Sequence, residues 1–298
     1  FLMIYAKLWK DISFKNINKK LAQSMLKYSL PLIPTTIFWW ITNVSDRYMV
    51  TYFLGESQNG LYTAAYKIPT LLTLVTGVFS EAWQFSAVKE SNPENAPAFY
   101  SNVFSCFQSI IFTAGAFIIS FSKIGAKILF AESYYSAWAF IPMLAIAGVF
   151  SSFVNFLSSI YMVKKRSVKS FLTAMSGAII NILLNFILIP SQLTFGSFTF
   201  KCAGLGVQGT AVATLISYVT VFIIRAIDTR RLLKFDMHII RFAVNSVLIL
   251  LGAFAMLGIR ENTLMLVCVA VSYIAVVIAV NLKPIINMLK NLFFSKNI

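Results

Sequence analysis

Long stretches without a charged side chain constrain the fold of this chain more than any other feature. Of its 298 residues, 58% are hydrophobic and only 12% are charged, and the mean hydropathy is +0.78. A helix that spans a membrane needs about 20 predominantly apolar residues. The segments free of Asp, Glu, Lys and Arg are 28–45, 95–122, 133–163, 170–200, 202–224, 242–259 and 262–282. This pattern indicates a multi-pass membrane protein rather than a soluble domain.

The sequence predicts an all-α protein with about eight transmembrane helices. We expect these helices at 25–46, 59–88, 97–121, 135–163, 168–189, 204–226, 238–257 and 262–282. In order, the expected parts are a cytoplasmic linker or interfacial segment (1–24), a six-helix lobe (25–226), two additional helices (227–282) and an amphipathic cytoplasmic tail (283–298). The tail mixes lysines with apolar residues, so it should lie along anionic membrane lipids.

The basic residues are spread over several loops. The chain has 25 Lys and Arg residues and a formal net charge of +15. They gather in the N-terminal segment, in alternate loops and at the C terminus, and they are sparse in the loops between. The positive-inside rule then predicts that both termini lie in the cytoplasm. Because the charge does not form one patch, we expect no nucleic-acid partner.

One expected helix, 59–88, carries charged residues in its interior. At helical spacing, one face would be formed by Thr63, Lys67, Thr70, Leu74, Gly77, Glu81 and Gln84. A charge deep in hydrocarbon costs about 2.5–3.5 kcal/mol on insertion scales, so Lys67 and Glu81 should face a wet cavity. The alternative is that Lys67 extends to the outer membrane surface and Glu81 to the inner one.

Further polar residues mark other expected helices. The first helix should bend at Pro31 and Pro34. The same helix places Asn43 and Arg47 on one face, with Asp46 beside Arg47. This acidic–basic pair either ends the helix at the interface or belongs to the cavity.

The fourth and fifth expected helices carry Asn155, Asn181 and Asn185. The last two helices are almost uniformly apolar, and we expect them to be peripheral.

Several classes of site are disfavoured. Three widely spaced cysteines and the single His238 exclude a multi-histidine metal site and a disulfide framework. Gly204, Gly206 and Gly209 have the spacing of a dinucleotide-binding motif, but they open a membrane helix instead of following a β-strand. We expect these glycines to serve close helix packing.

Two segments carry a family resemblance. "SLPLIPTTIFWWITNVSDRYMVTYFLGESQNGLYTAAYKIPTLLTLVTGVFSEAWQFSA" resembles the seventh and eighth membrane helices of bacterial flippases for polysaccharide or O-antigen repeat units. These flippases belong to the multidrug/oligosaccharidyl-lipid/polysaccharide (MOP) exporter superfamily. "GLGVQGTAVATLISY" is similar to a Gly/Ala-rich helix near the end of that family's second lobe.

The resemblance implies two six-helix lobes around a central cavity, in the bacterial cytoplasmic membrane. It implies export of undecaprenyl-diphosphate-linked oligosaccharides for capsule, O-antigen or exopolysaccharide synthesis. The first lobe is absent from this chain, so the chain corresponds to the second lobe with two extra helices. Further implied partners are a polysaccharide polymerase and chain-length regulators.

The expected site follows from the negative charge of a lipid diphosphate. Lys67 is the first candidate for a phosphate contact and Arg47 the second. The remaining cavity candidates are polar residues: Asn43, Thr70, Gln84, Asn155, Asn181 and Asn185. Glu81 and Asp46 are candidates for coupling transport to H+ or Na+, and we expect no catalytic residue, bound metal or other cofactor. The alternatives are a cation-coupled drug exporter of the related MATE type and, less favoured, a membrane polysaccharide polymerase.

Overall fold

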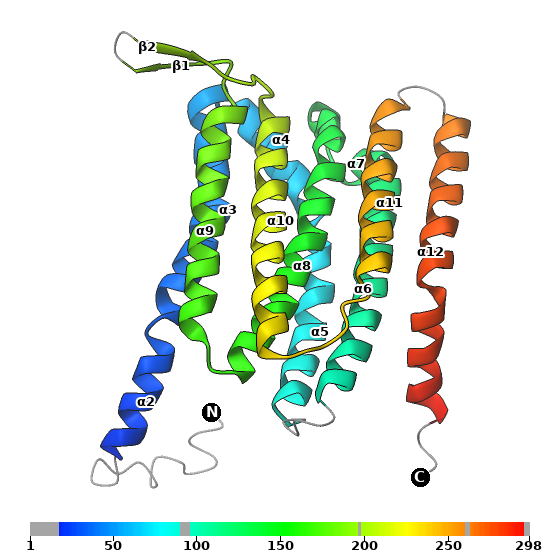
Figure 1. Ribbon diagram of the computed structural model, residues 1–298. Helices are drawn as coiled ribbons and strands as arrows, with labels where there is room; N and C mark the ends of the chain where they lie inside the picture. Colours follow the sequence, from blue (N-terminus) through cyan, green and yellow to red (C-terminus); the bar gives the residue numbers. More distant parts are fainter. Residues whose placement is uncertain (1–17, 90–95, 196–197, 260–262, 295–298) are drawn as a thin grey trace, which may run out of the picture.

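The chain forms a bundle of helices that run roughly along one direction (Figure 1). The computed structural model describes residues 18–89, 96–195, 198–259 and 263–294. The N-terminal elements are α2 (Lys19–Ser29), α3 (Leu32–Leu54), α4 (Glu56–Lys67), α5 (Thr70–Lys89), α6 (Ala96–Ser120), α7 (Ser122–Leu129) and the 3-10 helix η3 (Glu132–Phe140). They are followed by α8 (Ile141–Val163), α9 (Ser167–Leu188), β1 (Gln192–Phe195), β2 (Phe198–Lys201), α10 (Val207–Leu232), α11 (Ile239–Gly258) and α12 (Thr263–Phe294).

Successive long helices alternate in direction. α3, α6, α9 and α11 run from the end of the bundle where α2 lies (the α2 end) to the end that carries the β1–β2 hairpin (the hairpin end) (Figure 1). The paired helices α4–α5 and the helices α8, α10 and α12 run back. The C-terminal end of α12 therefore lies at the α2 end, as expected for an even number of passes.

The predicted all-α class is confirmed, with one small addition. A two-stranded antiparallel hairpin, in which Gln192 pairs with Lys201, occupies an expected loop. Among the described residues, six segments are long and apolar enough to cross a membrane: α6, Glu132–Val163, α9, α10, α11 and Leu264–Pro284. The first two expected spans are not among them, so the total of about eight stays a prediction.

The expected single helix over 59–88 is wrong. The chain is helical over Glu56–Lys67 and Thr70–Lys89, and Ile68 and Pro69 form a turn between them. Proline has no N–H group, and its ring collides with the preceding helical turn. Lys67 therefore ends one helix, and Glu81 lies on another.

The two ends of the chain also differ from their predicted bounds. The bend at Pro31 is confirmed, because α2 ends at Ser29 and α3 begins at Leu32. α3 continues to Leu54, beyond the predicted end at residue 46. The predicted separate tail is continuous with α12 as far as Phe294, across Pro284, while residues 1–17 and 295–298 lie outside the described residues.

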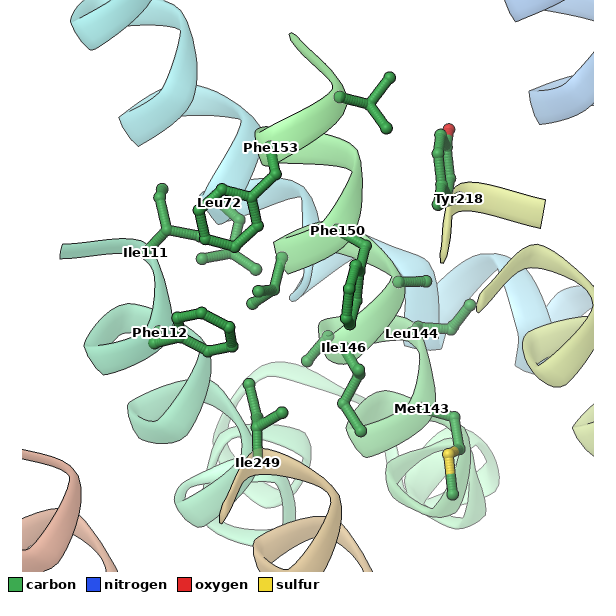
Figure 2. Packing of buried hydrophobic residues seen from close by; sticks show 14 of the residues in the cluster. Leu72, Ile111, Phe112, Met143, Leu144, Ile146, Phe150, Phe153, Tyr218 and Ile249 are labelled. Carbon is green, nitrogen blue, oxygen red and sulfur yellow. The ribbon is translucent and has the colours of Figure 1, made fainter. Parts of the chain in front are cut away.

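α8 lies at the centre of the bundle and packs against α5, α6 and α10. Its aromatic residues pack against those of α6. The ring centroid of Phe153 lies 5.7 Å from that of Phe107 and 5.3 Å from that of Phe112. Figure 2 shows Phe112 of α6 on the same side of α8 as Phe153, while Phe150 packs against Phe222 of α10 and Phe242 of α11. Lipid is as apolar as this core, so close van der Waals packing is what holds such helices together.

Glycines permit the closest helix contacts. A Cβ atom on Gly209 would lie 2.6 Å from the backbone oxygen of Leu188, and one on Gly177 would lie 2.6 Å from Val221. Gly204 and Gly206 have φ of +64° and +58° and form the turn that leads into α10. The expected packing role is therefore confirmed for Gly209, whereas Gly204 and Gly206 serve the turn.

A buried amide pair joins the last two helices. Asn245 of α11 and Asn281 of α12 exchange hydrogen bonds of 3.1 and 2.8 Å, and both side chains are buried. α12 also packs against α6. α11 and α12 thus carry a polar pair at their contact. The prediction that both helices are almost uniformly apolar did not include this pair.

The Gly209 contact predicts the effect of one added methyl group. Gly209→Ala should lower the free energy of unfolding by about 1–3 kcal/mol, because the clash is with rigid backbone. Gly77→Ala is the matched control, since Gly77 is also inside a helix and nothing lies within 4 Å of an added Cβ. Thermal unfolding of the purified protein in detergent measures both, and equal stability of the two variants would contradict the packing assignment.

Candidate functional site

A buried carboxylate lies where α3, α4, α9 and α10 meet. Asp46 of α3 is 1% exposed. Its Oδ2 accepts hydrogen bonds from the hydroxyl of Tyr62 (2.9 Å) and the hydroxyl of Thr214 (2.6 Å). Its Oδ1 accepts one from the amide of Asn185 (2.7 Å). Three other helices therefore supply the donors for this one side chain.

The hydrogen bonds extend beyond the carboxylate. Oδ1 of Asn181 accepts hydrogen bonds from the Ser45 hydroxyl (3.2 Å) and the Asn185 amide (3.3 Å). Oδ1 of Asn185 and Oγ1 of Thr210 are buried and have no hydrogen-bond partner among the described residues. We call Ser45, Asp46, Tyr62, Asn181, Asn185, Thr210 and Thr214 the Asp46 cluster.

The Asp46 cluster has the chemistry of a small cation site. Neither ion pair formed within the described part of the chain includes Asp46. A buried carboxylate without a countercharge is costly, and it is stabilised by hydrogen bonds, by protonation or by a bound cation. The unpartnered oxygens are Oδ1 of Asn185, whose amide nitrogen donates to Asp46, and Oγ1 of Thr210, which lies one helical turn before Thr214. Oxygen ligands of this kind suit a hard cation. The arrangement can therefore hold a proton or a small cation.

The expected pairing of Asp46 with Arg47 is wrong. Successive residues of a helix point about 100° apart, and Asp46 is buried while Arg47 is exposed. Asn43 is also exposed, and its Oδ1 accepts a hydrogen bond from the Tyr66 hydroxyl (3.1 Å). Asn43 and Arg47 thus lie on the same exposed face of α3, as the spacing predicts.

A second feature is an open cavity of about 820 Å³ beside α4. It lies toward the hairpin end, where α4 and α7 are found (Figure 1). The residues that line it are Thr51, Glu56, Asn59, Gly60, Thr63, Ala64, Lys67, Ile68, Leu71, Leu129, Phe130, Ala131 and Tyr134. Lys67 is the only Lys or Arg in this lining, and Glu56 is the only acidic residue.

The α4 wall of this cavity is one helix face. Glu56, Asn59, Thr63 and Lys67 follow one another at spacings of three or four residues. Lys67 is exposed and ends the helix, and its backbone carbonyl accepts a hydrogen bond from the hydroxyl of Thr70. The α4 part of the predicted polar stripe therefore lines a real cavity.

The other predicted site residues are scattered. Glu81 of α5 and Asn155 of α8 are exposed and do not line the cavity. Gln84 lies in α5, and its side chain is outside the described residues. The structure brings Asp46 together with Asn181 and Asn185, but it does not join this cluster to Lys67.

The most prominent residue that sequence reasoning missed is Arg225. It lies in α10, close to the end of the expected helix 204–226, and it is fully buried. Nε donates to the Thr173 hydroxyl (3.0 Å), Nη1 donates to the Val154 carbonyl (2.9 Å) and to Ser158, and the guanidinium lies 5.5 Å from the Trp39 ring centroid.

A sequence signal for this residue did exist. Thr214, Tyr218, Val221 and Arg225 recur at spacings of four, three and four residues. This periodicity places Arg225 on the same helix face as the polar stripe of α10.

The hydrogen bond from Thr214 predicts a stability effect. Thr214→Val removes one donor from a buried carboxylate and should lower the free energy of unfolding by about 1–3 kcal/mol. The control is Thr220→Val on the same helix, because the Thr220 hydroxyl donates to the Ile216 carbonyl of its own helix (2.8 Å). Thermal unfolding in detergent compares the two, and a Thr214→Val protein as stable as the control would contradict the described cluster.

Comparison with known proteins gives one match to a family model. The family described as "Polysaccharide biosynthesis protein" matches residues 1–85, which include α3 and α4. No curated protein matches the chain.

Solved structures show where the fold occurs. The lipid II flippase MurJ in its inward closed conformation matches with a TM-score of 0.59 and 15% identity, over 91% of this chain and 57% of that one. A multidrug resistance MATE family transporter of the MOP superfamily, in an outward-facing conformation, matches with a TM-score of 0.52 and 16% identity, over 89% of this chain and 66% of that one. The chain spans less than two thirds of either structure. The fold of this chain is therefore similar to part of the fold of each of these two proteins.

Proposed function

We propose that this chain is the C-terminal part of a transporter that flips undecaprenyl-diphosphate-linked oligosaccharide repeat units. The direction proposed is from the cytoplasmic to the outer leaflet of the bacterial cytoplasmic membrane, with both termini in the cytoplasm. The sequence resemblance over the first helices, the family match over residues 1–85 and the MOP-type fold support this proposal. Transport by alternating access requires a second lobe that moves against this one.

The observation that carries the proposal is Lys67 in the open cavity beside α4. A lipid diphosphate is anionic, and a cation in a partly desolvated cavity attracts it strongly. The volume of about 820 Å³ is that of a site for a small ligand. Asn59, Thr63 and Tyr134 of the lining supply hydroxyl and amide groups for sugar hydroxyls. Lys67 is therefore proposed as the phosphate contact.

The exposed face of α3 that carries Asn43 and Arg47 is proposed as a second part of the substrate path. Asn43 and Arg47 are exposed there, and Asn155 is exposed on α8. Polar groups on spanning helices are costly toward lipid, so they favour a wet surface shared with the other lobe.

The Asp46 cluster is proposed as the coupling site for H+ or Na+. Its buried carboxylate and the two unpartnered oxygens of Asn185 and Thr210 support this role. A cation that binds here neutralises the Asp46 carboxylate, which is hydrogen-bonded to three other helices. Two conformations that differ in these contacts would bind the cation with different affinities. Glu81 remains the second candidate, as an exposed carboxylate on α5.

The phosphate role of Lys67 predicts a loss of export. In the full-length protein, Lys67→Ala should reduce polymer export about tenfold or more, because a close charge pair contributes about 1.5 kcal/mol or more. Lys127→Ala is the control, since Lys127 is exposed on α7 and does not line the cavity. Surface polymer in a deletion strain is the measurement, with the amount of protein in the membrane checked by immunoblot.

A second readout separates a cavity from a lipid-facing lysine. Cysteines that replace Asn59, Thr63 and Lys67 of the cavity lining should react with a membrane-impermeant thiol reagent faster than a cysteine at the exposed apolar position Val78. Normal export by Lys67→Ala, or equal labelling at all four positions, would reject the phosphate role.

The coupling role of Asp46 predicts the effect of an isosteric change. Asp46→Asn keeps the size of the side chain, removes its charge and should reduce export about tenfold or more. Glu132→Gln, at an exposed carboxylate, should leave export unchanged. Full export by Asp46→Asn would overturn the role.

Thermal unfolding identifies the ion. If sodium binds at this cluster, the wild type unfolds at a higher temperature in NaCl than in choline chloride, and Asp46→Asn abolishes the difference. If the wild type shows no sodium effect but an Asp46-dependent response to pH, the ion is a proton.

The alternative function is a MATE-like, cation-coupled drug exporter, which the second structural match favours. Cationic drugs suit a cavity dominated by carboxylates, whereas one Glu and one Lys line the cavity here. A polysaccharide polymerase is the less favoured alternative. Measuring drug susceptibility and polymer chain length in the deletion strain separates these functions. Crosslinking in the membrane would detect a polymerase or chain-length regulator that binds this protein.

A further inference from the structure

We propose that a groove between α9 and α10, at the α2 end of the bundle, binds one anionic phospholipid. Its headgroup would carry hydroxyl groups, as that of phosphatidylglycerol does. The groove has a volume of about 400 Å³. It is lined by Tyr161, Lys169, Leu172, Thr173, Ile224, Ile227, Asp228 and Arg231. It is separate from the cavity beside α4 and from the Asp46 cluster, and the proposal does not depend on the transported substrate.

Along the bundle, the charged and apolar residues of the groove follow the same order as the headgroup and acyl chains of a phospholipid. Lys169 lies in the first turn of α9, and Arg231 lies in the last turn of α10, so both charges are at the α2 end (Figure 1). Leu172, Ile224 and Ile227 lie deeper along these helices and are 48%, 38% and 54% exposed. Both helices are long and apolar enough to span a membrane. Charges therefore lie at headgroup depth and apolar side chains at acyl-chain depth.

The charges of the groove fit a lipid with one negative charge. Lys169 forms an ion pair with Asp228, and Arg231 is exposed and forms no ion pair within the described part of the chain. Two cations and one carboxylate leave a single positive charge at the rim. Basic pockets between membrane helices are typical binding sites for anionic headgroups.

Two buried polar atoms indicate what the headgroup carries. The Tyr161 hydroxyl and the Asp228 carboxylate lie close enough to interact with each other, and neither this hydroxyl nor Oδ2 of Asp228 has another hydrogen-bond partner among the described residues. A hydroxyl and a carboxylate that face each other can each form a further hydrogen bond to a polyol. A phosphodiester at Arg231 and Lys169 would place glycerol hydroxyls beside Asp228 and Tyr161, where they can both donate and accept.

Lipid binding to the purified full-length protein tests this site. Native mass spectrometry measures the binding of palmitoyl-oleoyl phosphatidylglycerol to delipidated protein, with phosphatidylethanolamine as the zwitterionic comparison. Arg231→Ala should weaken phosphatidylglycerol binding about fivefold, as one surface cation contributes to anionic lipid binding. Leu172→Trp should weaken it by a similar factor without a change in charge, because it fills the groove.

Two controls match these variants. Lys234→Ala removes one exposed cation from the same end of the bundle outside the groove, and Val168→Trp adds the same ring at an exposed position of α9 outside the groove. Both should bind the lipid as the wild type does. The proposal is overturned if the controls lose as much affinity as the groove variants, if neither groove variant loses affinity, or if phosphatidylethanolamine binds equally well and is equally affected.

Discussion

The rest of this structure depends on the need to satisfy one buried carboxylate. Asp46 belongs to α3, and its three hydrogen-bond donors come from α4, α9 and α10. In a bilayer no water replaces a lost donor, so each of these helices is held in register by the same side chain. The site proposed for ion coupling is therefore also the point where four helices meet.

A second buried charge lies farther along α10. Arg225 is fully buried, and it donates hydrogen bonds to the hydroxyls of Thr173 and Ser158 and to two backbone carbonyls. Within the described part of the chain, none of its hydrogen-bond partners is a carboxylate. Thr214 and Arg225 are eleven positions apart in α10, which corresponds to roughly 16 Å along the helix. The two opposite charges are too far apart to pair, so each needs its own polar shell. Between them Gly177 lets α9 and α10 approach closely, and the Ser217 hydroxyl donates to its carbonyl (3.0 Å).

The break at Pro69 separates α4, which forms a wall of the open cavity, from α5. α4 is short and carries Lys67 and its polar neighbours, while α5 packs against the central helix α8. A proline turn between them allows the cavity wall to be oriented independently of the packed helix. This geometry places a cation at the rim of a cavity without burying it in the core.

The sequence by itself determined the class of protein, because hydrophobic length and helical period do not depend on tertiary contacts. Apolar stretches predicted most of the helices, Pro31 predicted the first break, and Gly209 predicted a close helix contact. Periodicity also placed Asn43 and Arg47 on one face of α3.

Only the tertiary structure decided which partner each polar face meets. Asp46 contacts Asn185 instead of its neighbour Arg47, and Arg225, near the end of the expected helix 204–226, is fully buried. A helical period fixes which residues share a face, but the residues that satisfy a buried charge lie far away in the chain, as Thr214 does for Asp46. Their meeting depends on how the helices pack, and no local pattern contains that information.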